Sequence, residues 1–182
     1  MTAKLDNLEY LVKAKLPTVT VERLSDAVVL HVTCEQLLDV CTKLRDDAEL
    51  DFKMLIDIAG VHYPNREKPL EVVYQLLSVY RNHRIRIKVA IDDGCPVPSV
   101  ISVWSCADWY EREAYDLMGI LFSNHPDLRR ILNDYDFEGY PLRKDFPVTG
   151  HYDVFYDPEL QRVVRRAVDL SRENREFYRP QR

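Results

Sequence analysis

Residues 51–63 read DFKMLIDIAGVHY and carry the clearest β-strand pattern in the chain. Two series of side chains alternate along this segment: Phe52, Met54, Ile56 and Ile58 against Lys53, Leu55 and Asp57. Because successive side chains of a strand point to opposite faces, this period of two predicts a β-strand. A single strand leaves backbone hydrogen-bonding groups unpaired, so neighbouring segments must supply partner strands.

Further strands are predicted on both sides of this segment. Downstream, an apolar segment, 70–80, and an alternating segment, 84–92, are separated by a short turn. This arrangement predicts an antiparallel hairpin with one face toward water. Upstream, residues 18–23 and 27–32 predict two short strands with a turn between them.

Two helices are predicted in the first fifty residues. Apolar side chains recur at helical spacing in residues 4–14, and Pro17 ends that helix. A second helix is predicted over residues 34–47, with Thr33 as its N-cap and Gln36 as the partner in a capping box.

A third helix is predicted over residues 107–118. Asp108 and Glu111 have the spacing of an N-terminal capping box at its start. Gly119 follows the last helical residue and can adopt the left-handed conformation that ends many helices.

Together these elements predict an α+β fold, in which a mixed or antiparallel sheet is packed with helices. Residues 1–120 are expected to form the compact domain, and residues 121–182 a long, extended, largely irregular tail. Residues 160–171 could form a helix or an amphipathic strand. The predicted tail keeps many aromatic side chains: Tyr135, Phe137, Tyr140, Phe146, Tyr152, Phe155, Tyr156, Phe177 and Tyr178. Such a segment is expected to dock on a partner that covers these side chains.

The composition is that of a globular protein, since 46% of the 182 residues are hydrophobic and 30% are charged. A net charge of -5 argues against a dedicated nucleic-acid binder. The sequence has no apolar leader and no run near the roughly 18 apolar residues of a membrane span, so a cytosolic location is expected. Its four cysteines form no CxxC pair, which favours reduced thiols over zinc or iron-sulfur ligands.

Charged side chains concentrate at the third predicted helix. Glu111 and Glu113 are two positions apart and point in different directions from a helix, so they cannot share one metal ion or proton. Arg112 lies four positions before Asp116, which predicts an ion pair on one helix face. A surface or interface role for these charges is therefore preferred to catalysis.

His125, Arg129 and Arg130 form a second charged group, with two interpretations. They could hold a phosphate or another anionic substrate of a small enzyme. Alternatively, the arginines neutralise neighbouring aspartates such as Asp127, or carboxylates of a partner. The second interpretation is favoured because no glycine-rich loop precedes them. No two histidines have metal-ligand spacing, so no catalytic, cofactor-binding or metal site is predicted.

The segment EREAYDLMGILFSNHPDLRRIL, residues 111–132, resembles the signature of the 30 kDa subunit (C type) of the respiratory NADH:quinone oxidoreductase, complex I. The segment GYPLRKDFP, residues 139–147, resembles the next block of that family. The resemblance implies that the matching positions are conformational and interface residues: Glu111, Arg112, Glu113, Asp116, His125, Asp127, Arg129, Arg130, Pro141, Arg143, Lys144, Asp145 and Phe146.

The resemblance also implies a function. Members of this family are non-catalytic subunits of the peripheral arm and support assembly near the quinone site. The chain would bind no cofactor itself, and FMN and iron-sulfur clusters would belong to partner subunits. The partners would be the large quinone-site subunit (D type) and iron-sulfur subunits of the B and I types, with no nucleic acid.

The resemblance places the chain peripherally on the cytoplasmic side of the bacterial inner membrane, attached only through the complex. The alternative is the homologous subunit of a membrane-bound hydrogenase, or of a related dehydrogenase with another electron donor.

Overall fold

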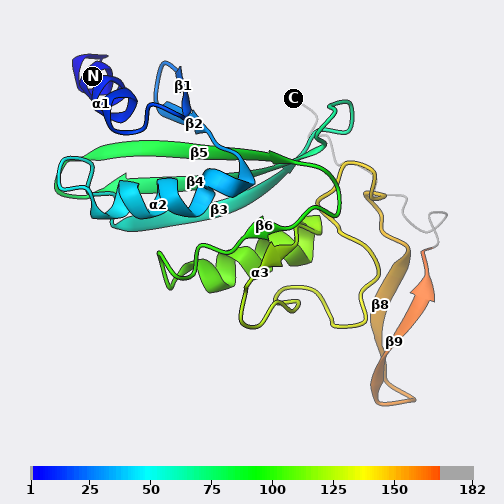
Figure 1. Ribbon diagram of the computed structural model, residues 1–182. Coiled ribbons are helices and arrows are strands. Elements are labelled where there is room, and N and C mark those ends of the chain that lie inside the picture. Colours follow the sequence, from blue (N-terminus) through cyan, green and yellow to red (C-terminus); the bar gives the residue numbers. More distant parts are fainter. Residues whose placement is uncertain (1, 169–182) are drawn as a thin grey trace, which may run out of the picture. The chain divides into compact units, whose positions relative to one another are not determined.

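The computed structural model describes residues 2–168 and shows one mixed five-stranded sheet with helices packed against it (Figure 1). The α+β prediction is therefore confirmed. The described chain divides after Asp145 into two compact units.

The central sheet has the strand order β1-β2-β5-β4-β3. The strands are β1 (Thr20–Arg23), β2 (Val28–His31), β3 (Met54–His62), β4 (Leu70–Ser78) and β5 (His83–Ile91). The pairs β1 with β2, β3 with β4 and β4 with β5 are antiparallel. The pairing of β4 with β5 confirms the predicted hairpin. Strands β2 and β5 are parallel, which makes the sheet mixed.

The strand predicted from residues 51–63 is confirmed as β3, but a bulge interrupts its alternation. Leu55 pairs with Leu76, and the next paired residue, Asp57, faces Gln75. After the extra residue the side chains point to the opposite faces of the sheet from those that strict alternation would give. Leu55 and Ile58, three positions apart, are therefore both buried. An uninterrupted period of two cannot reveal such a reversal.

Within residues 2–168, four helical segments accompany the sheet: α1 (Thr2–Lys15), the 3₁₀ turn η1 (Cys34–Gln36), α2 (Leu37–Asp46) and α3 (Ala107–Met118). Helix α2 lies along the sheet in Figure 1 and buries an apolar stripe in the core. Thr33 is the N-cap residue of η1, as predicted, but its side chain makes no cap hydrogen bond, so the predicted capping box with Gln36 does not form. The 3₁₀ turn precedes α2 and supplies the start of the helix.

Helix α3 packs on β3. Gly60 of β3 allows this approach, since a Cβ there would lie 2.8 Å from the side chains of both Met118 and Ile120. The helix ends at Gly119, as predicted, with a left-handed φ of 72°. The predicted capping box is wrong, because Cys106 is the N-cap residue and makes no side-chain cap hydrogen bond.

Residues 121–145, placed in the tail by the sequence pattern, belong to the first compact unit. Apart from β7 (Phe122–Ser123), which pairs in parallel with β6 (Val97–Pro98), they are irregular. Side-chain hydrogen bonds to α3 hold them in place.

The second unit contains a hairpin of β8 (Tyr152–Asp157) and β9 (Arg162–Ala167). For residues 162–167 the strand alternative is thus confirmed. Phe177 and Tyr178 lie outside the described residues. No helix within residues 2–168 is long and apolar enough to cross a membrane.

Candidate functional site

Asp116, near the C-terminal end of α3, gathers the chain that follows the helix. Its Oδ2 accepts hydrogen bonds from three consecutive backbone N–H groups, at 3.0, 2.7 and 2.8 Å: Ile131, Leu132 and Asn133. Its Oδ1 accepts from the Asn133 amide at 2.9 Å and from the Arg130 guanidinium at 2.6 Å. Because Asp116 is fully buried, these donors replace the water that would otherwise solvate it.

These contacts also set the protonation of Asp116. Burial alone would raise the pKa of this carboxyl. The hydrogen bonds from Asn133, Arg130 and Leu132 outweigh burial and hold the pKa of Asp116 well below its usual range. The loop is therefore ordered around a fixed negative charge.

Arg112 and Arg130 complete the network from two directions. Besides Asp116, Arg130 binds the carbonyl oxygen of Phe137 at 2.9 Å. Arg112 donates to the carbonyl oxygens of Arg129 and Arg130, both at 3.2 Å. The predicted Arg112–Asp116 pair is wrong. The loop after α3 places the guanidinium of Arg130 at Asp116, and it places the backbone carbonyl groups of Arg129 and Arg130 at Arg112.

His125 forms a second link between α3 and the loop, and its ring is fully buried. Its Nδ1 lies 3.0 Å from the backbone N of Asp127. A backbone N–H can only donate, so Nδ1 is unprotonated and Nε2 carries the hydrogen. Nε2 then donates to the carbonyl oxygen of Asp108 at 3.2 Å. The ring is thus a neutral structural link.

Glu111 is also fully buried and faces the loop before α3. Its Oε1 accepts the backbone N–H of Val100 at 2.7 Å. Its Oε2 lies 4.0 Å from His125 Nε2 and has no hydrogen-bond partner among the described residues. Burial raises the pKa of Glu111, and the hydrogen bonds that its carboxyl group accepts only partly oppose that rise. This orientation toward Val100 also explains why no capping box forms.

Arg143, in the second block, ties the chain back to the body of the first unit. Its Nε donates to the carbonyl oxygen of Met118 at 2.7 Å, and its two Nη atoms bind the carboxylate of Asp93 at 2.8 and 2.7 Å. Its guanidinium carbon lies 4.9 Å from the ring centre of Tyr140. This pairing lowers the pKa of Asp93 and raises that of Arg143. Arg143 therefore joins the end of α3 to the loop after β5.

The residues after Arg143 make further contacts. The backbone N–H of Lys144 donates to His62 Nδ1 at 3.1 Å, and an Asp145 carboxylate oxygen lies 3.7 Å from the same nitrogen. Phe146 is the first residue of the second unit, and its ring packs edge-on against His151, with ring centres 5.4 Å apart.

A third set of signature residues points toward solvent. Glu113 is exposed, and exposed Asp127 pairs with exposed Arg129 at 2.8 Å. Pro141 is half-buried. Trp109, which the sequence pattern did not single out, lies four positions before Glu113 and is 68% exposed. An aromatic residue on the outer face of an amphipathic helix is the signal that would have found it.

The geometry weakens the anionic-substrate interpretation. His125 and Arg130 are committed to internal bonds, and Arg129 binds Asp127 and the hydroxyl of Tyr135. The interpretation that the arginines neutralise nearby aspartates holds for Arg129 with Asp127. Residues 2–168 contain no group of three or more potential ligands that could hold a metal ion.

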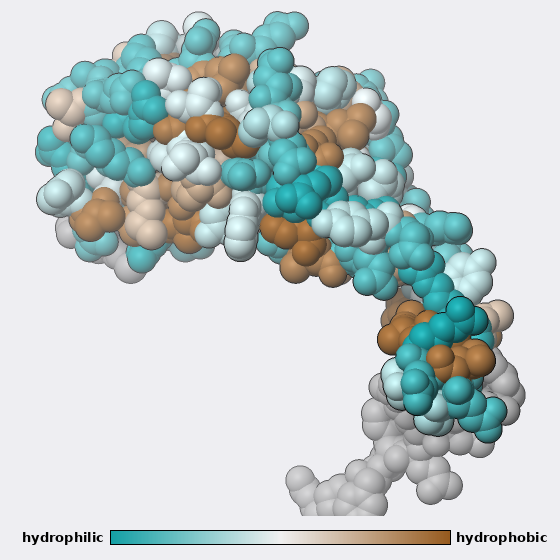
Figure 2. Space-filling view, turned by 90° about the horizontal axis from the view of Figure 1, so that it is seen from below, coloured by the Kyte–Doolittle hydropathy of each residue, from teal (hydrophilic) through white to brown (hydrophobic). Residues whose placement is uncertain are grey.

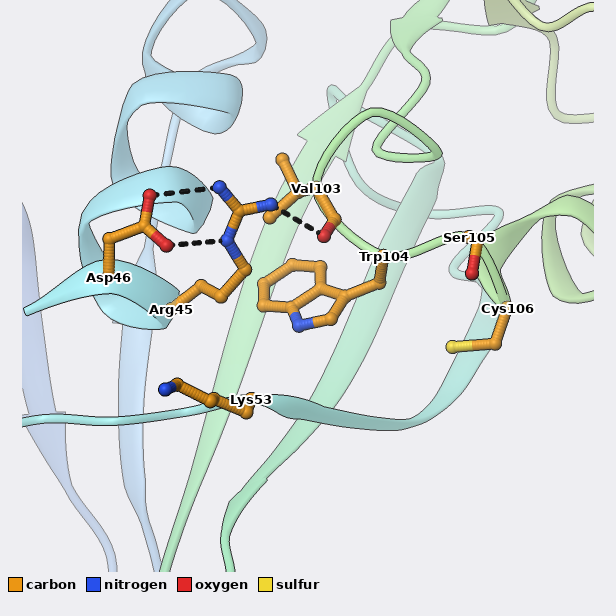
Figure 3. Close-up of a pocket in the computed structure, with 7 residues that line it drawn as sticks. All are labelled: Arg45, Asp46, Lys53, Val103, Trp104, Ser105 and Cys106. Carbon is orange, nitrogen blue, oxygen red and sulfur yellow. Dashed lines mark hydrogen bonds and ion pairs between the residues drawn. The ribbon is translucent and has the colours of Figure 1, made fainter.

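Figure 3 shows a hollow between the end of α2 and the loop before α3. Arg45 forms two hydrogen bonds with the Asp46 carboxylate, and it donates to the carbonyl oxygen of Val103 at 2.8 Å. The buried ring of Trp104 lies beside these groups. These contacts hold the loop before α3, and the Val100 N–H of the same loop donates to Glu111. The hollow is therefore lined by the loop that also binds α3 through Glu111.

Fold and site together define a small α+β protein that uses a charged helical motif to fix its own following loop. The chain matches the family described as the respiratory-chain NADH dehydrogenase, 30 Kd subunit, over residues 30–152. It is 57% identical over 152 residues to the C-type subunit of NADH-quinone oxidoreductase from Methylobacterium sp. (strain 4-46), covering 84% of this chain and 71% of that protein. It is 55% identical over 166 residues to the protein of that name from Brucella abortus (strain 2308), covering 86% and 82%.

The chain therefore belongs to the family of the 30 kDa subunit of respiratory-chain NADH dehydrogenase. This confirms the resemblance seen in residues 111–132 and 139–147, both of which lie inside the matched region. As a subunit of NADH-quinone oxidoreductase, it functions with partner subunits.

Proposed function

We propose that this chain is a non-catalytic peripheral-arm subunit of the proton-translocating NADH:quinone oxidoreductase, supporting assembly and structure near the quinone-site subunit. That enzyme passes electrons from NADH through FMN and iron-sulfur centres to quinone, and in this proposal those cofactors belong to partner subunits. The partners are the large quinone-site subunit (D type) and iron-sulfur subunits (B and I types). The chain attaches to the cytoplasmic side of the bacterial inner membrane only through them.

One observation supports this proposal most strongly: the charged residues of the signature segment, 111–132, order the part of the chain that follows α3. The carboxylate of Asp116 and the guanidinium groups of Arg112 and Arg130 fix the segment after α3 by hydrogen bonds to its backbone. Arg143 ties the end of that segment to Asp93. A segment ordered before binding loses less conformational entropy on docking, which is what a rigid assembly subunit needs.

The ordered segment and α3 present several large exposed side chains. Trp109, Leu132, Tyr135 and Leu142 are exposed by 68%, 62%, 76% and 57%. Figure 2 looks from the side of α3 and shows hydrophobic residues at several places among hydrophilic ones. Aromatic and apolar groups within a charged surround are typical of a protein interface. We take Trp109 and Glu113 on α3 as the surface for a partner.

This proposal is tested with Trp109→Ala and Glu113→Ala in the full chain, produced with the remaining subunits. Both side chains are exposed, so the variants are expected to fold normally. The amount of assembled complex and its NADH:quinone activity should fall together. Tyr80→Ala is the matched control, because Tyr80 is an 89% exposed aromatic residue in the turn between β4 and β5. Normal assembly in both α3 variants would contradict the proposal.

The cofactor part of the proposal has its own test. The purified full chain should contain neither flavin nor iron, measured by absorbance and by metal analysis. Stoichiometric flavin or iron would overturn it. The family and the names of the relatives favour the NADH-linked enzyme over the hydrogenase alternative.

A further inference from the structure

Cys34 and Cys95 lie at the same end of the parallel strand pair β2 and β5. The pairing of the two strands continues past the end of β2, because the backbone N–H of Val32 donates to the carbonyl oxygen of Lys88 at 3.0 Å. Cys34 follows two residues after Val32, and β5 ends at Ile91, three residues after Lys88. Both segments therefore leave the sheet at one edge.

A tight turn after β5 brings the chain back toward η1. The backbone N–H of Cys95 donates to the carbonyl oxygen of Asp92 at 3.1 Å, which closes this turn. Strand β6 begins at Val97, and η1, whose first residue is Cys34, contacts β6. The turn thus carries Cys95 to the start of η1.

Both cysteines line one cavity of the first unit, which Lys68, Lys88 and Glu35 also line. Cys95 is exposed, Cys34 is half-buried, and both thiols are free. The two sulfur groups influence each other electrostatically. Burial raises the pKa of the Cys34 thiol, and negative charge on Cys95 raises it further.

The difference in exposure gives the two thiols different chemistry. An oxidant reacts with a thiolate that it can reach from solvent, and Cys95 is the exposed member of the pair. Burial holds Cys34 as a neutral thiol, which protects it from direct attack. Its place in the same cavity lets it react instead with an oxidised Cys95.

We propose that Cys34 and Cys95 are a modification site that forms a reversible disulfide with hydrogen peroxide as the oxidant. The Cys95 thiolate attacks one peroxide oxygen, the O–O bond breaks, and Cys95 sulfenic acid and hydroxide form. The hydroxide takes up the proton that the Cys95 thiol released and becomes water. The Cys34 sulfur then displaces the sulfenic hydroxyl group, which leaves as a second water with the Cys34 proton. Two thiols and one peroxide thus give one disulfide and two waters.

The bond would connect η1 to the turn after β5, which also contains Asp93. Because Asp93 binds Arg143 of the second signature block, oxidation would add a covalent restraint next to that ion pair. A thiol reductant would remove the restraint by exchange with the disulfide. The inference goes beyond the proposed function and does not rest on it.

The test treats the purified full chain with hydrogen peroxide, alkylates the remaining thiols and maps unreduced peptides by tandem mass spectrometry, which assigns each sulfur. We expect a Cys34–Cys95 link that dithiothreitol cleaves. Cys106 is the internal control, because it is also an exposed free cysteine and should stay outside the link. Cys34 and Cys95 both alkylated where Cys106 is oxidised would overturn the inference, as would a link to Cys106 or between two copies.

Three single variants separate the roles of the two thiols. In Cys34→Ser the link should be lost, and Cys95 should accumulate as a sulfenic acid that dimedone traps. In Cys95→Ser the link should also be lost, and Cys34 should remain a thiol. Cys106→Ser is the matched control and should form the link in the same yield as the unaltered chain. Absence of the dimedone adduct in Cys34→Ser, or oxidation of Cys34 in Cys95→Ser, would contradict the assigned roles.

Discussion

Asp116 is the residue on which the segment after α3 depends. It accepts the N–H groups of three consecutive loop residues and the guanidinium of Arg130, and its own side chain is fully buried. A buried carboxylate with so many donors leaves each of them unsatisfied when it is removed. Its role could not be read from the sequence, since helical spacing pointed to Arg112 and the actual partner lies fourteen residues downstream.

Substitution of Asp116 by Asn tests this role. The amide keeps the shape, but it loses the charge and directs hydrogen-bond donors toward other donors. We expect the free energy of unfolding to fall by about 3–5 kcal/mol, the usual effect of breaking a buried ion pair. Urea unfolding measures it. Asp127→Asn is the control, because it breaks only the exposed pair with Arg129, which water screens, and it should leave the free energy of unfolding almost unchanged.

The two buried carboxyls of α3 predict opposite pH dependence. Asp116 has a lowered pKa in the folded chain, so its contribution is present above the unfolded pKa of about 3.9 and is lost as the pH falls. Glu111 has a raised pKa, so its contribution is present below about pH 4.3 and is lost as the pH rises.

Urea midpoints between about pH 3 and pH 8 test these signs against matched variants. The deficit of Asp116→Asn relative to the unaltered chain should shrink toward low pH. The unaltered chain should lose stability relative to Glu111→Gln as the pH rises. A pH-independent difference in both comparisons would contradict the assignment.

At the scale of elements, the junction after α3 connects the helix to the ordered segment. Gly119 ends the helix at φ 72°, and the Tyr140 ring packs so closely that a Cβ on Gly119 would lie 2.6 Å from it. Arg143 binds the carbonyl oxygen of Met118 immediately before this turn. The turn, the ring and the guanidinium hold one another in place.

Gly119→Ala is expected to destabilise the chain through two effects, the left-handed backbone and the clash with Tyr140. The backbone effect alone costs about 1–2 kcal/mol. Gly94→Ala isolates that effect, because Gly94 has φ 78° and a Cβ added there would meet no heavy atom within 4 Å. Thermal unfolding should show a clearly larger loss for Gly119→Ala. Equal losses in the two variants would show that the ring contact is unimportant.

Periodicity predicted the regular elements well and their local exceptions poorly. The alternation of residues 51–63 predicted β3, and Gly119 predicted the end of α3. The bulge between Leu55 and Asp57 and the absence of the Thr33 capping box depend on packing that no local pattern contains. Residues 124–145 show no period because side-chain hydrogen bonds to α3 and to the loop after β5, and not a backbone ladder, hold them.

The chain combines a compact α+β unit, residues 1–145, with a second compact unit that contains the β8–β9 hairpin. The resemblance pointed to residues 111–147, and the hydrogen-bonded charges after α3 lie within that range. It could not separate inward residues, such as Asp116 and Arg143, from outward ones, such as Glu113. Which of these side chains are buried depends on how the segment after α3 folds back against the helix.

We infer that the charged residues of segment 111–132 order the chain after α3 before any partner binds. Hydrogen-deuterium exchange of the isolated full chain tests it most directly, at the amides of Ile131, Leu132 and Asn133 that bind Asp116. The claim predicts that these amides are protected in the unaltered chain and lose protection in Asp116→Asn. Exchange of all three at the rate of an unstructured chain would contradict it.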